Sequence, residues 1–319
     1  MLTATHVKSF GAGALEAGLN WKTKGLIQKT LSTLPGGSSC NYFLQRSLGG
    51  LRSDARIHGA FEMDIAVFFE RMARLDLDPA KSRILEIGTG WLPVFPLSLA
   101  LAGFRHVQTV DLYAHLRESA VRRTLLALER YLDHPAFRPF ATPEQVRANF
   151  HRLARSNSIF AEAGISYKAP CNAASTGWPA GSLDLITSNN VFEHVPVPVL
   201  LDLFAEARRL LRPSGHVIHC VNCGDHYAYA DRSITQLNYL SFSEAEWSRW
   251  NNSIQYQNRL RPVDFMEMAD SQHLRVESAE FTPSESSLLQ LQTMVIAPEF
   301  RHYSLDQLAS TSLTLIASA

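Results

Sequence analysis

Ile84-Leu85-Glu86-Ile87-Gly88-Thr89-Gly90 is the stretch that decides the fold. The run Arg83–Ile87, which overlaps the start of this stretch, has no alternation of polar and apolar residues. It therefore predicts a strand that is buried on both faces. Gly88 and Gly90 then let the backbone turn tightly and approach a ligand that a side chain would block. A helix is expected to follow over Phe95–Ala102. Strand, glycine turn and helix in this order begin an open α/β sheet.

A second apolar run ends in an acid about 20 residues after the glycine turn, at Val107-Gln108-Thr109-Val110-Asp111. In a doubly wound sheet, the end of this strand carries the carboxylate that binds ribose hydroxyls. An acid after a strand is often just a cap, so Asp111 alone is ambiguous. Combined with the glycine turn, it predicts a nucleotide-type cofactor site.

The composition limits the classes of partner. The chain has 319 residues, of which 46% are hydrophobic and 19% are charged, with a formal net charge of zero. The balanced charge argues against nucleic acid and membrane surfaces as partners, and no apolar run reaches the roughly 18 residues of a membrane span. The N-terminus lacks a secretory signal pattern, and four cysteines do not make a disulfide framework in a chain of this length. We therefore predict a cytoplasmic protein without a membrane partner. Its oligomeric state stays open, with a homodimer among the options.

Residues 1–80 precede the sheet and are predicted to form a helical N-terminal cap. Apolar residues at helical spacing extend over Leu15–Leu31 and Ala60–Leu75, and Ser39 is a suitable cap for a short helix over Cys40–Leu48. Such a cap either covers the ligand pocket or is a plain structural extension, and the sequence leaves both open.

Residues 81–319 alternate strands and helices, as expected for an open, mostly parallel sheet. Two stretches are too long for simple connections and are predicted as insertions, at about 114–160 and 224–262. Further strands are expected at 165–168, 182–188, 216–221, 275–281 and 312–317, and further helices at 115–132, 142–154, 198–211 and 263–271.

Three motifs resemble those of class I S-adenosylmethionine-dependent methyltransferases. Glu86–Gly90 is similar to the family's E-x-G-x-G turn, and Leu183–Val195 resembles its fourth-strand motif with the frequent Glu-His ending. Leu210–His216 resembles the turn before its fifth strand. The resemblance implies a Rossmann-like α/β fold, in which a seven-stranded, mostly parallel sheet carries helices on both faces and its last strand is antiparallel.

The same resemblance implies S-adenosylmethionine as the cofactor. The family often has an acid near the adenine after the third strand, but Ala169–Ala174 contains none, so Asn172 or a backbone amide is expected in its place. Gln257–Arg261 also looks similar to bacterial methyltransferases of surface-glycan or other specialised small-molecule metabolism. The cofactor-binding residues implied in this way are Glu86, Gly88, Thr89, Gly90, Asp111, Leu112, Asn172, Asn189 and Asn190.

Two histidines are candidate catalytic residues. His194 follows the fourth strand, at the edge where open α/β sheets bind ligands, and its ordinary pKa suits a proton acceptor or a substrate contact. A helix cap is the alternative role for His194. His226, next to Asp225, lines the mouth of the fifth strand and is the second candidate base.

The run from His219 to His226 also contains Cys220 and Cys223, which invites a zinc interpretation. The spacing argues against it, because His219 and Cys220 are neighbours in a strand and point to opposite faces. The chain has no second cysteine pair either. We therefore predict no metal site.

The polar and aromatic stretch 225–261 is the candidate acceptor pocket, since binding pockets combine aromatic walls with a few orienting polar groups. Arg259 or Arg261 could bind a carboxylate or phosphate through two guanidinium nitrogens at once. The alternative is a structural lid with surface polar groups. The predicted substrate-binding residues are Asp225, Tyr227, Trp250, Tyr256, Asn258 and Arg259.

Together these features predict direct displacement of a methyl group from S-adenosylmethionine onto a small polar acceptor, either a sugar hydroxyl or an amino-acid-like metabolite. Whether oxygen, sulfur or nitrogen accepts the methyl stays open. A non-catalytic cofactor-binding or scaffold protein is one alternative, because fold does not imply function. A nicotinamide-dependent oxidoreductase is the other, but Gly88–Pro93 lacks the third glycine of its motif.

Overall fold

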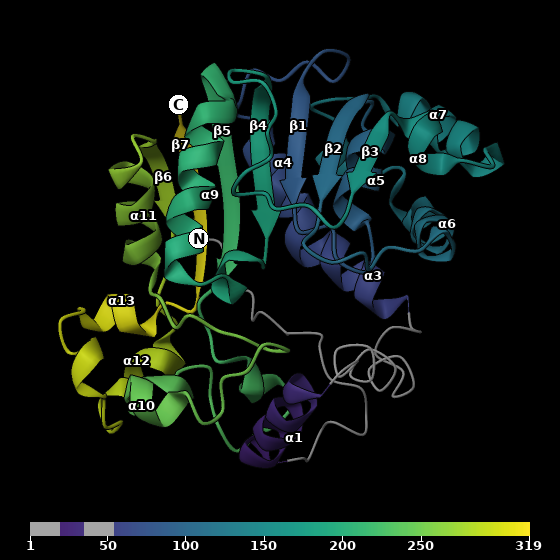
Figure 1. Ribbon diagram of the computed structural model, residues 1–319. Helices are drawn as coiled ribbons and strands as arrows, with labels where there is room; N and C mark the ends of the chain where they lie inside the picture. The colour runs from purple at the N-terminus through teal and green to yellow at the C-terminus, as the bar shows by residue number, and fades with distance from the viewer. Residues whose placement is uncertain (1–19, 35–53) are drawn as a thin grey trace.

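The computed structural model describes residues 20–34 and 54–319, and its centre is a seven-stranded sheet (Figure 1). The strand order is β3-β2-β1-β4-β5-β7-β6. The strands are β1 (Arg83–Ile87), β2 (His106–Val110), β3 (Ile165–Lys168), β4 (Leu183–Asn189), β5 (Leu211–Asn222), β6 (Arg275–Glu280) and β7 (Ser312–Ser318).

The pairing is parallel from β3 across to β5 and antiparallel on both sides of β7. β1 lies at the centre, where Ile84 is opposite Val107 of β2 and Leu185 of β4. The predicted seven-stranded, mostly parallel α/β sheet with an antiparallel last strand is therefore confirmed. Because β1, β2, β4 and β5 run the same way, their carboxyl ends meet at one edge, which is where ligands bind in such sheets.

β5 begins at Leu211 rather than at the predicted residue 216. Leu211 already pairs with Leu183, and the register then shifts before Leu185 pairs with His216. The Pro-Ser-Gly run was expected to be a turn, but it is taken into the strand as an irregularity. Local composition favoured a turn, whereas pairing with β4 decided the outcome.

Helices cover both faces of the sheet (Figure 1). One face carries α5 (Val94–Leu101), α6 (Glu118–Ala127), α7 (Pro143–Arg155) and α8 (Ile159–Ala163), and the other carries α9 (Val197–Leu210) and α11 (Pro262–Ser271). α7 starts where the sequence predicts, because the Thr142 hydroxyl accepts from the backbone of Gln145 while the Gln145 side chain accepts from the backbone of Thr142.

The described part of residues 1–80 divides between two places. α3 (Ala55–Ala60), a π-helical turn over Phe61–Ile65 and α4 (Ala66–Met72) pack on the same face of the sheet as α5, through buried residues such as Phe61. The short helix expected over Cys40–Leu48 lies outside the described residues.

α1 (Trp21–Thr33) packs away from the sheet, near α10 (Glu244–Trp247), α12 (Glu285–Leu291) and α13 (Leu305–Ala309), at the bottom of Figure 1. Trp21 is 4% exposed, and its ring lies 5.7 Å from that of Tyr227 and 5.3 Å from that of Trp250. The Trp21 amide also donates to Asp231 at 2.9 Å. α1 therefore belongs structurally with the segment that follows β5.

Within residues 20–34 and 54–319, the helices are all too short or too polar to cross a membrane. The three described cysteines, Cys171, Cys220 and Cys223, are free thiols.

Candidate functional site

The glycine turn after β1 has the backbone that only glycine adopts without strain. Gly88 has φ 87° and Gly90 has φ 65°. A Cβ at Gly88 would lie 2.4 Å from Cγ2 of Val191, which follows β4, so this glycine permits the two loops to touch. A Cβ at Gly90 would have no atom within 4 Å, so the space above Gly90 is open to a ligand.

Asp111 connects the end of β2 to this turn. One carboxylate oxygen accepts from the Gly90 amide at 2.8 Å, and the other accepts from the Tyr113 amide at 3.1 Å. Its backbone carbonyl accepts from Cys171 at 2.9 Å and so ties down the loop after β3. The carboxylate is half-buried and is held in place by backbone amides beside the open space. This arrangement fits a ligand that carries adjacent hydroxyls, such as a ribose.

Glu86 lies beneath the turn, where it is buried and accepts from the Thr109 hydroxyl at 2.5 Å. Burial raises the pKa of Glu86 to about 8; the Thr109 hydrogen bond opposes this shift, and the negative charge of Asp111 adds to it. The Thr89 hydroxyl contacts that of Thr109, so Thr89 is also oriented toward this buried pair.

The other predicted cofactor residues lie around the same edge. Leu112 is 57% exposed beside Asp111, and Asn172 is exposed, with its side-chain oxygen accepting from the amide of Ala174. Asn189 donates from Nδ2 to Asp64 of the π-helical turn at 3.1 Å, and its Oδ1 is buried without a hydrogen bond. The last of them, Asn190, is exposed with φ 53°, and its amide donates to the carbonyl of Cys220 at 2.9 Å.

A second group of polar side chains lies where β4 and β5 end. Glu193, His194 and His226 each present one potential ligand atom, and these atoms lie within 4.8 Å of one another. The Glu193 side chain is 3% exposed, and neither of its carboxylate oxygens has a hydrogen-bond partner. Its nearest basic neighbour is Nε2 of His226, at 3.9 Å from Oε1. The structure thus brings the two predicted histidines together and adds Glu193, which belongs to the Leu183–Val195 motif but is not among the predicted site residues.

The electrostatics of this group follow from burial. Desolvation raises the pKa of Glu193 to about 8; the nearby backbone amides of Glu193 and Asn222 oppose the shift without meeting hydrogen-bond geometry. Desolvation lowers the pKa of His226 to about 3, and the charges of His194 and Lys24 add to the effect. His226 is therefore a neutral imidazole near pH 7.

Residues 256–258 hold both turns of this group in place. Nδ1 of His194 donates to the carbonyl of Tyr256 at 2.6 Å, and the Asn258 side chain donates to the carbonyls that flank Glu193 and His194, at 2.7 and 2.9 Å. The Gln257 side chain accepts from the amide of His226 at 3.0 Å. We call residues 256–258 the brace. Tyr256 and Asn258, predicted to bind substrate, thus contact the site through the protein backbone.

The remaining predicted substrate residues are tied into the protein interior. Asp225 is fully buried, and its carboxylate accepts from Asn238 and from the amide of Tyr227, both at 2.8 Å. The Tyr227 hydroxyl donates to the carbonyl of Trp250 at 2.9 Å, inside the aromatic packing around α1. Through these contacts, Asp225 and Tyr227 stabilise the fold of the 225–262 segment.

Arg259 and Arg261 likewise have partners within the protein. Arg259 is 5% exposed, donates to the carbonyls of Tyr239 and Phe242, and pairs with Glu244 at 2.5 Å. Arg261 is fully buried and donates to backbone carbonyls, including that of Cys223 at 2.8 Å. A substrate anion would have to displace these contacts.

His219, Cys220 and Cys223 do not gather around a common centre with His226. Nδ1 of His219 pairs with the Ser188 hydroxyl at 2.8 Å, and its ring stacks on Phe192 at 4.2 Å. Desolvation lowers the pKa of His219 to about 3, so this is a neutral core histidine. Within the described ranges, the group that could hold a metal is Glu193, His194 and His226 instead.

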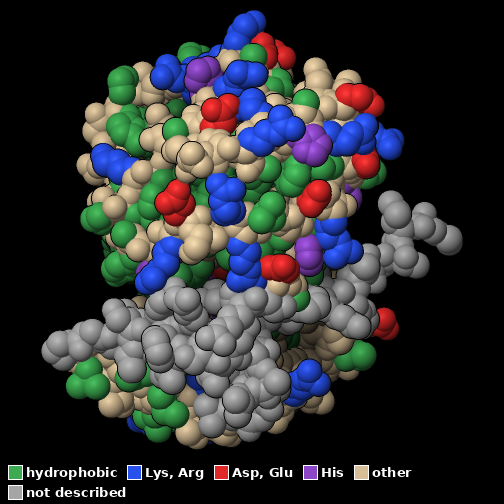
Figure 2. All heavy atoms as spheres, turned by 90° about the vertical axis from the view of Figure 1, so that its right-hand side faces the viewer, with side chains coloured by type: hydrophobic (Ala, Val, Ile, Leu, Met, Phe, Trp, Pro, Cys, Tyr) green, Lys and Arg blue, Asp and Glu red, His purple; other side chains and the backbone are tan. Residues whose placement is uncertain are grey.

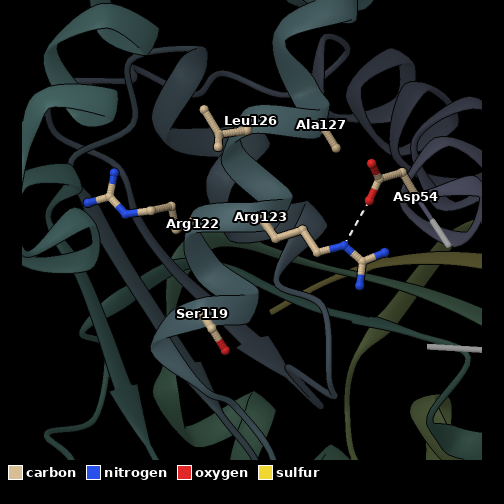
Figure 3. A pocket seen from close by; sticks show the side chains of 6 residues that line it. All are labelled: Asp54, Ser119, Arg122, Arg123, Leu126 and Ala127. Atoms are coloured by element: carbon tan, nitrogen blue, oxygen red, sulfur yellow. Dashed lines mark hydrogen bonds and ion pairs between the residues drawn. The ribbon is translucent and has the colours of Figure 1, made fainter. Parts of the chain in front are cut away.

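A surface pocket of about 460 Å³ lies on α6, away from this edge (Figure 3). Arg123 pairs there with Asp54 at 2.8 Å, and Arg122 donates to the carbonyls of Ala154 and Ser156. Figure 2, which shows the molecule from the α6–α8 side, displays basic, acidic and histidine side chains intermixed on that face. None of the predicted site residues lines this pocket, so the carboxyl edge of the sheet is the candidate site.

Comparisons with known proteins give distant structural likenesses and one family-model match. No curated protein matches the chain. Among solved structures, phosphoethanolamine N-methyltransferase 2 from Haemonchus contortus is 15% identical with a TM-score of 0.42, and the match covers 80% of this chain and 52% of that one, so this chain spans about half its length. An S-adenosylmethionine-dependent methyltransferase from Mesorhizobium loti is 15% identical with a TM-score of 0.43, covering 79% and 96%. Geranyl diphosphate C-methyltransferase from Streptomyces coelicolor A3(2) is 14% identical with a TM-score of 0.43, covering 79% and 78%.

The assignment rests on the family model rather than on these distant likenesses. A model described as a methyltransferase domain matches residues 62–275, which is 214 of the 319 residues. The matched region contains the glycine turn, Asp111 and all the strands from β1 to β5. The match therefore excludes the alternative of a nicotinamide-dependent oxidoreductase. The chain belongs to the methyltransferase-domain family and is a class I S-adenosylmethionine-dependent methyltransferase.

Proposed function

We propose that the chain transfers a methyl group from S-adenosylmethionine to a small polar acceptor at the carboxyl edge of β1, β2, β4 and β5. The observation that carries the proposal is the half-buried Asp111 carboxylate, oriented by the Gly90 amide beside open space. In this proposal Asp111 binds the ribose hydroxyls, and Gly88, Thr89 and Gly90 form the floor under the amino-acid part of the cofactor. Leu112 and Asn172 border the adenine, while Asn189 and Asn190 close the site from β4.

The cofactor supplies an activated sulfonium methyl, so the protein has to align the acceptor and exclude water. The glycine turn and Asp111 hold the donor at one end of the edge. Glu193, His194 and His226 define the neighbouring end, at β4 and β5, where the acceptor atom would approach. We place His194 and His226 in contact with the acceptor, with Tyr256 and Asn258 as positioning residues behind them.

The polar side chains at this end favour one class of acceptor. Two imidazoles and a carboxyl group suit a small acceptor with hydrogen-bonding groups, such as a sugar hydroxyl or an amino-acid-like metabolite. The internal pairing of Arg259 removes it from the acceptor contacts that we propose. A bacterial glycan or specialised-metabolite acceptor is part of this proposal.

Calorimetry on purified protein tests the donor site. Asp111→Ala should weaken S-adenosylmethionine binding by at least about a hundredfold, since the two charge-assisted hydrogen bonds proposed to the ribose are worth roughly 1.5–3 kcal/mol each. Glu118→Ala, an exposed acid on α6, is the matched control and should leave affinity unchanged. Wild-type affinity in a folded Asp111→Ala protein would refute the assignment. Transfer of a labelled methyl group into a metabolite extract, followed by mass spectrometry, would identify the acceptor.

A further inference from the structure

The Glu193 carboxyl is an unsatisfied group at the centre of the acceptor end. It is 97% buried by side-chain area, and both oxygens lack hydrogen bonds. Nε2 of His226, at 3.9 Å, also has no partner. Buried polar groups are nearly always hydrogen-bonded, so an orphaned carboxyl beside an orphaned imidazole nitrogen points to a missing ligand.

Protonation of Glu193 does not resolve this situation. A carboxylic acid at this position would still have a buried O–H and a buried C=O without partners, and the His226 nitrogen would stay unpaired. A single cation bound between them would satisfy the carboxylate and the imidazole together. Asp64 contributes a further negative charge that acts on Glu193, and a cation would offset it.

We propose that Glu193, His194 and His226 bind one divalent transition-metal ion of the zinc class. Two imidazole nitrogens and one carboxylate oxygen are a ligand set of catalytic zinc sites, which keep a further position open. Magnesium and calcium prefer all-oxygen ligands, so imidazoles select against them. Ligand atoms around zinc are about 3.4 Å apart, given metal–ligand bonds of about 2.0–2.1 Å. The His226–Glu193 pair at 3.9 Å would therefore need to close by about 0.5 Å, and the other pairs, which lie within 4.8 Å, by at most about 1.4 Å.

The surroundings of the group fit metal binding. A carbonyl oxygen can only accept, so the 2.6 Å contact to Tyr256 places the His194 proton on Nδ1 and leaves the lone pair on Nε2. A histidine that donates one N–H to a backbone carbonyl while the other nitrogen binds is the usual arrangement for a metal ligand. The brace also fixes the backbone of His226 through Gln257.

The metal would also narrow the acceptor to a hydroxyl compound, an extension that rests on the proposed function. A hydroxyl oxygen in the open position would lose its proton to solvent more readily, because the ion stabilises the resulting alkoxide. That oxygen then forms the bond to the methyl carbon as the carbon–sulfur bond breaks. The electron pair of the broken bond goes to sulfur, which becomes a neutral thioether.

Titration of the metal-free full-length protein with Co²⁺ tests the site, because bound Co²⁺ reports its ligands through visible absorption, and Zn²⁺ should displace it. We expect one equivalent to bind with a tetrahedral-type spectrum. Glu193→Gln and His194→Gln should each weaken Co²⁺ affinity by at least about 100-fold, the upper end of what loss of an outer-shell partner costs. His216→Gln is the matched control: Nε2 of His216 lies 3.4 Å from Glu277, a similar His–Glu pair without a third ligand.

Two readouts keep the outcomes separate. Without metal, Glu193→Gln should melt no lower than wild type, since it removes an unsatisfied buried carboxyl. His194 is exposed and gives a second variant, which loses one hydrogen bond to the Tyr256 carbonyl but no buried side chain. Absent saturable Co²⁺ binding, or unchanged binding in both variants, would overturn the metal site. Calorimetry with S-adenosylmethionine, run on the same samples, tests the donor site independently: loss of metal binding with intact cofactor binding rejects this inference alone.

Discussion

Gly88 and Gly90 both have a left-handed backbone, but Gly88 faces Val191 whereas Gly90 faces open space. Substitution at each position therefore tests a different role. Gly88→Ala should lower the free energy of unfolding by about 2–5 kcal/mol, because strain of 1–2 kcal/mol adds to a 2.4 Å clash with Val191. Gly90→Ala should cost only the strain, yet weaken S-adenosylmethionine binding at least about tenfold, since its methyl enters the open space. Gly181→Ala, with φ 62° and no atom within 4 Å, controls for strain alone. Urea unfolding and calorimetry measure both effects; if Gly90→Ala binds cofactor like Gly181→Ala, the open space is not the cofactor site.

At the scale of elements, the brace joins the turn after β4 to the turn after β5. Asn258→Ala removes two hydrogen bonds that the side chain donates to backbone carbonyls and one that its Oδ1 accepts from the Leu260 amide. At about 0.5–1.5 kcal/mol for each of the three bonds, the loss in unfolding free energy should be about 1.5–4.5 kcal/mol. Asn172→Ala, which removes one exposed local bond, should cost less than about 0.5 kcal/mol. Chemical denaturation compares the two. If the Asn258 variant is as stable as the Asn172 control, the Asn258 side chain of the brace does not contribute to the free energy of unfolding.

For the whole molecule, the buried Glu86 couples stability to pH. Its pKa is about 8 in the folded protein, whereas a glutamic acid in water has a pKa of 4.5, so the folded state holds the proton more tightly than the unfolded state. Folding therefore favours the protonated carboxyl. The contribution of Glu86 to the free energy of unfolding is fully present below pH 4.5 and is lost as the pH rises to about 8. Each pH unit in this window is worth at most about 1.4 kcal/mol. Glu86→Gln should therefore gain stability relative to wild type as pH increases from 5 to 8. Melting curves across that range measure the difference, and a constant difference would show that Glu86 titrates normally.

The sequence by itself determined the sheet, because its evidence is local. Apolar runs predicted the strands, and α7 begins at its Thr-Pro-Glu start as expected. Gly88, Gly90 and Asp111 could be predicted because a tight turn requires glycines and a strand end can be recognised from a short run of consecutive residues. The resemblance to class I S-adenosylmethionine-dependent methyltransferases begins in the same stretch, and the family model over residues 62–275 then shows the family.

Only the tertiary structure decided the roles of the polar residues after β5. Arg259 reads as a substrate contact in a polar, aromatic sequence, yet distant carbonyls and Glu244 take up its guanidinium. The same folding leaves Glu193 without a partner, since the residues that could pair with it, such as His226, lie 33 positions away and stop at 3.9 Å. Whether a buried charge is paired depends on contacts between segments far apart in the chain. No local pattern encodes those contacts, because the residue type and its sequence neighbours do not specify which distant backbone segment the fold places beside a side chain.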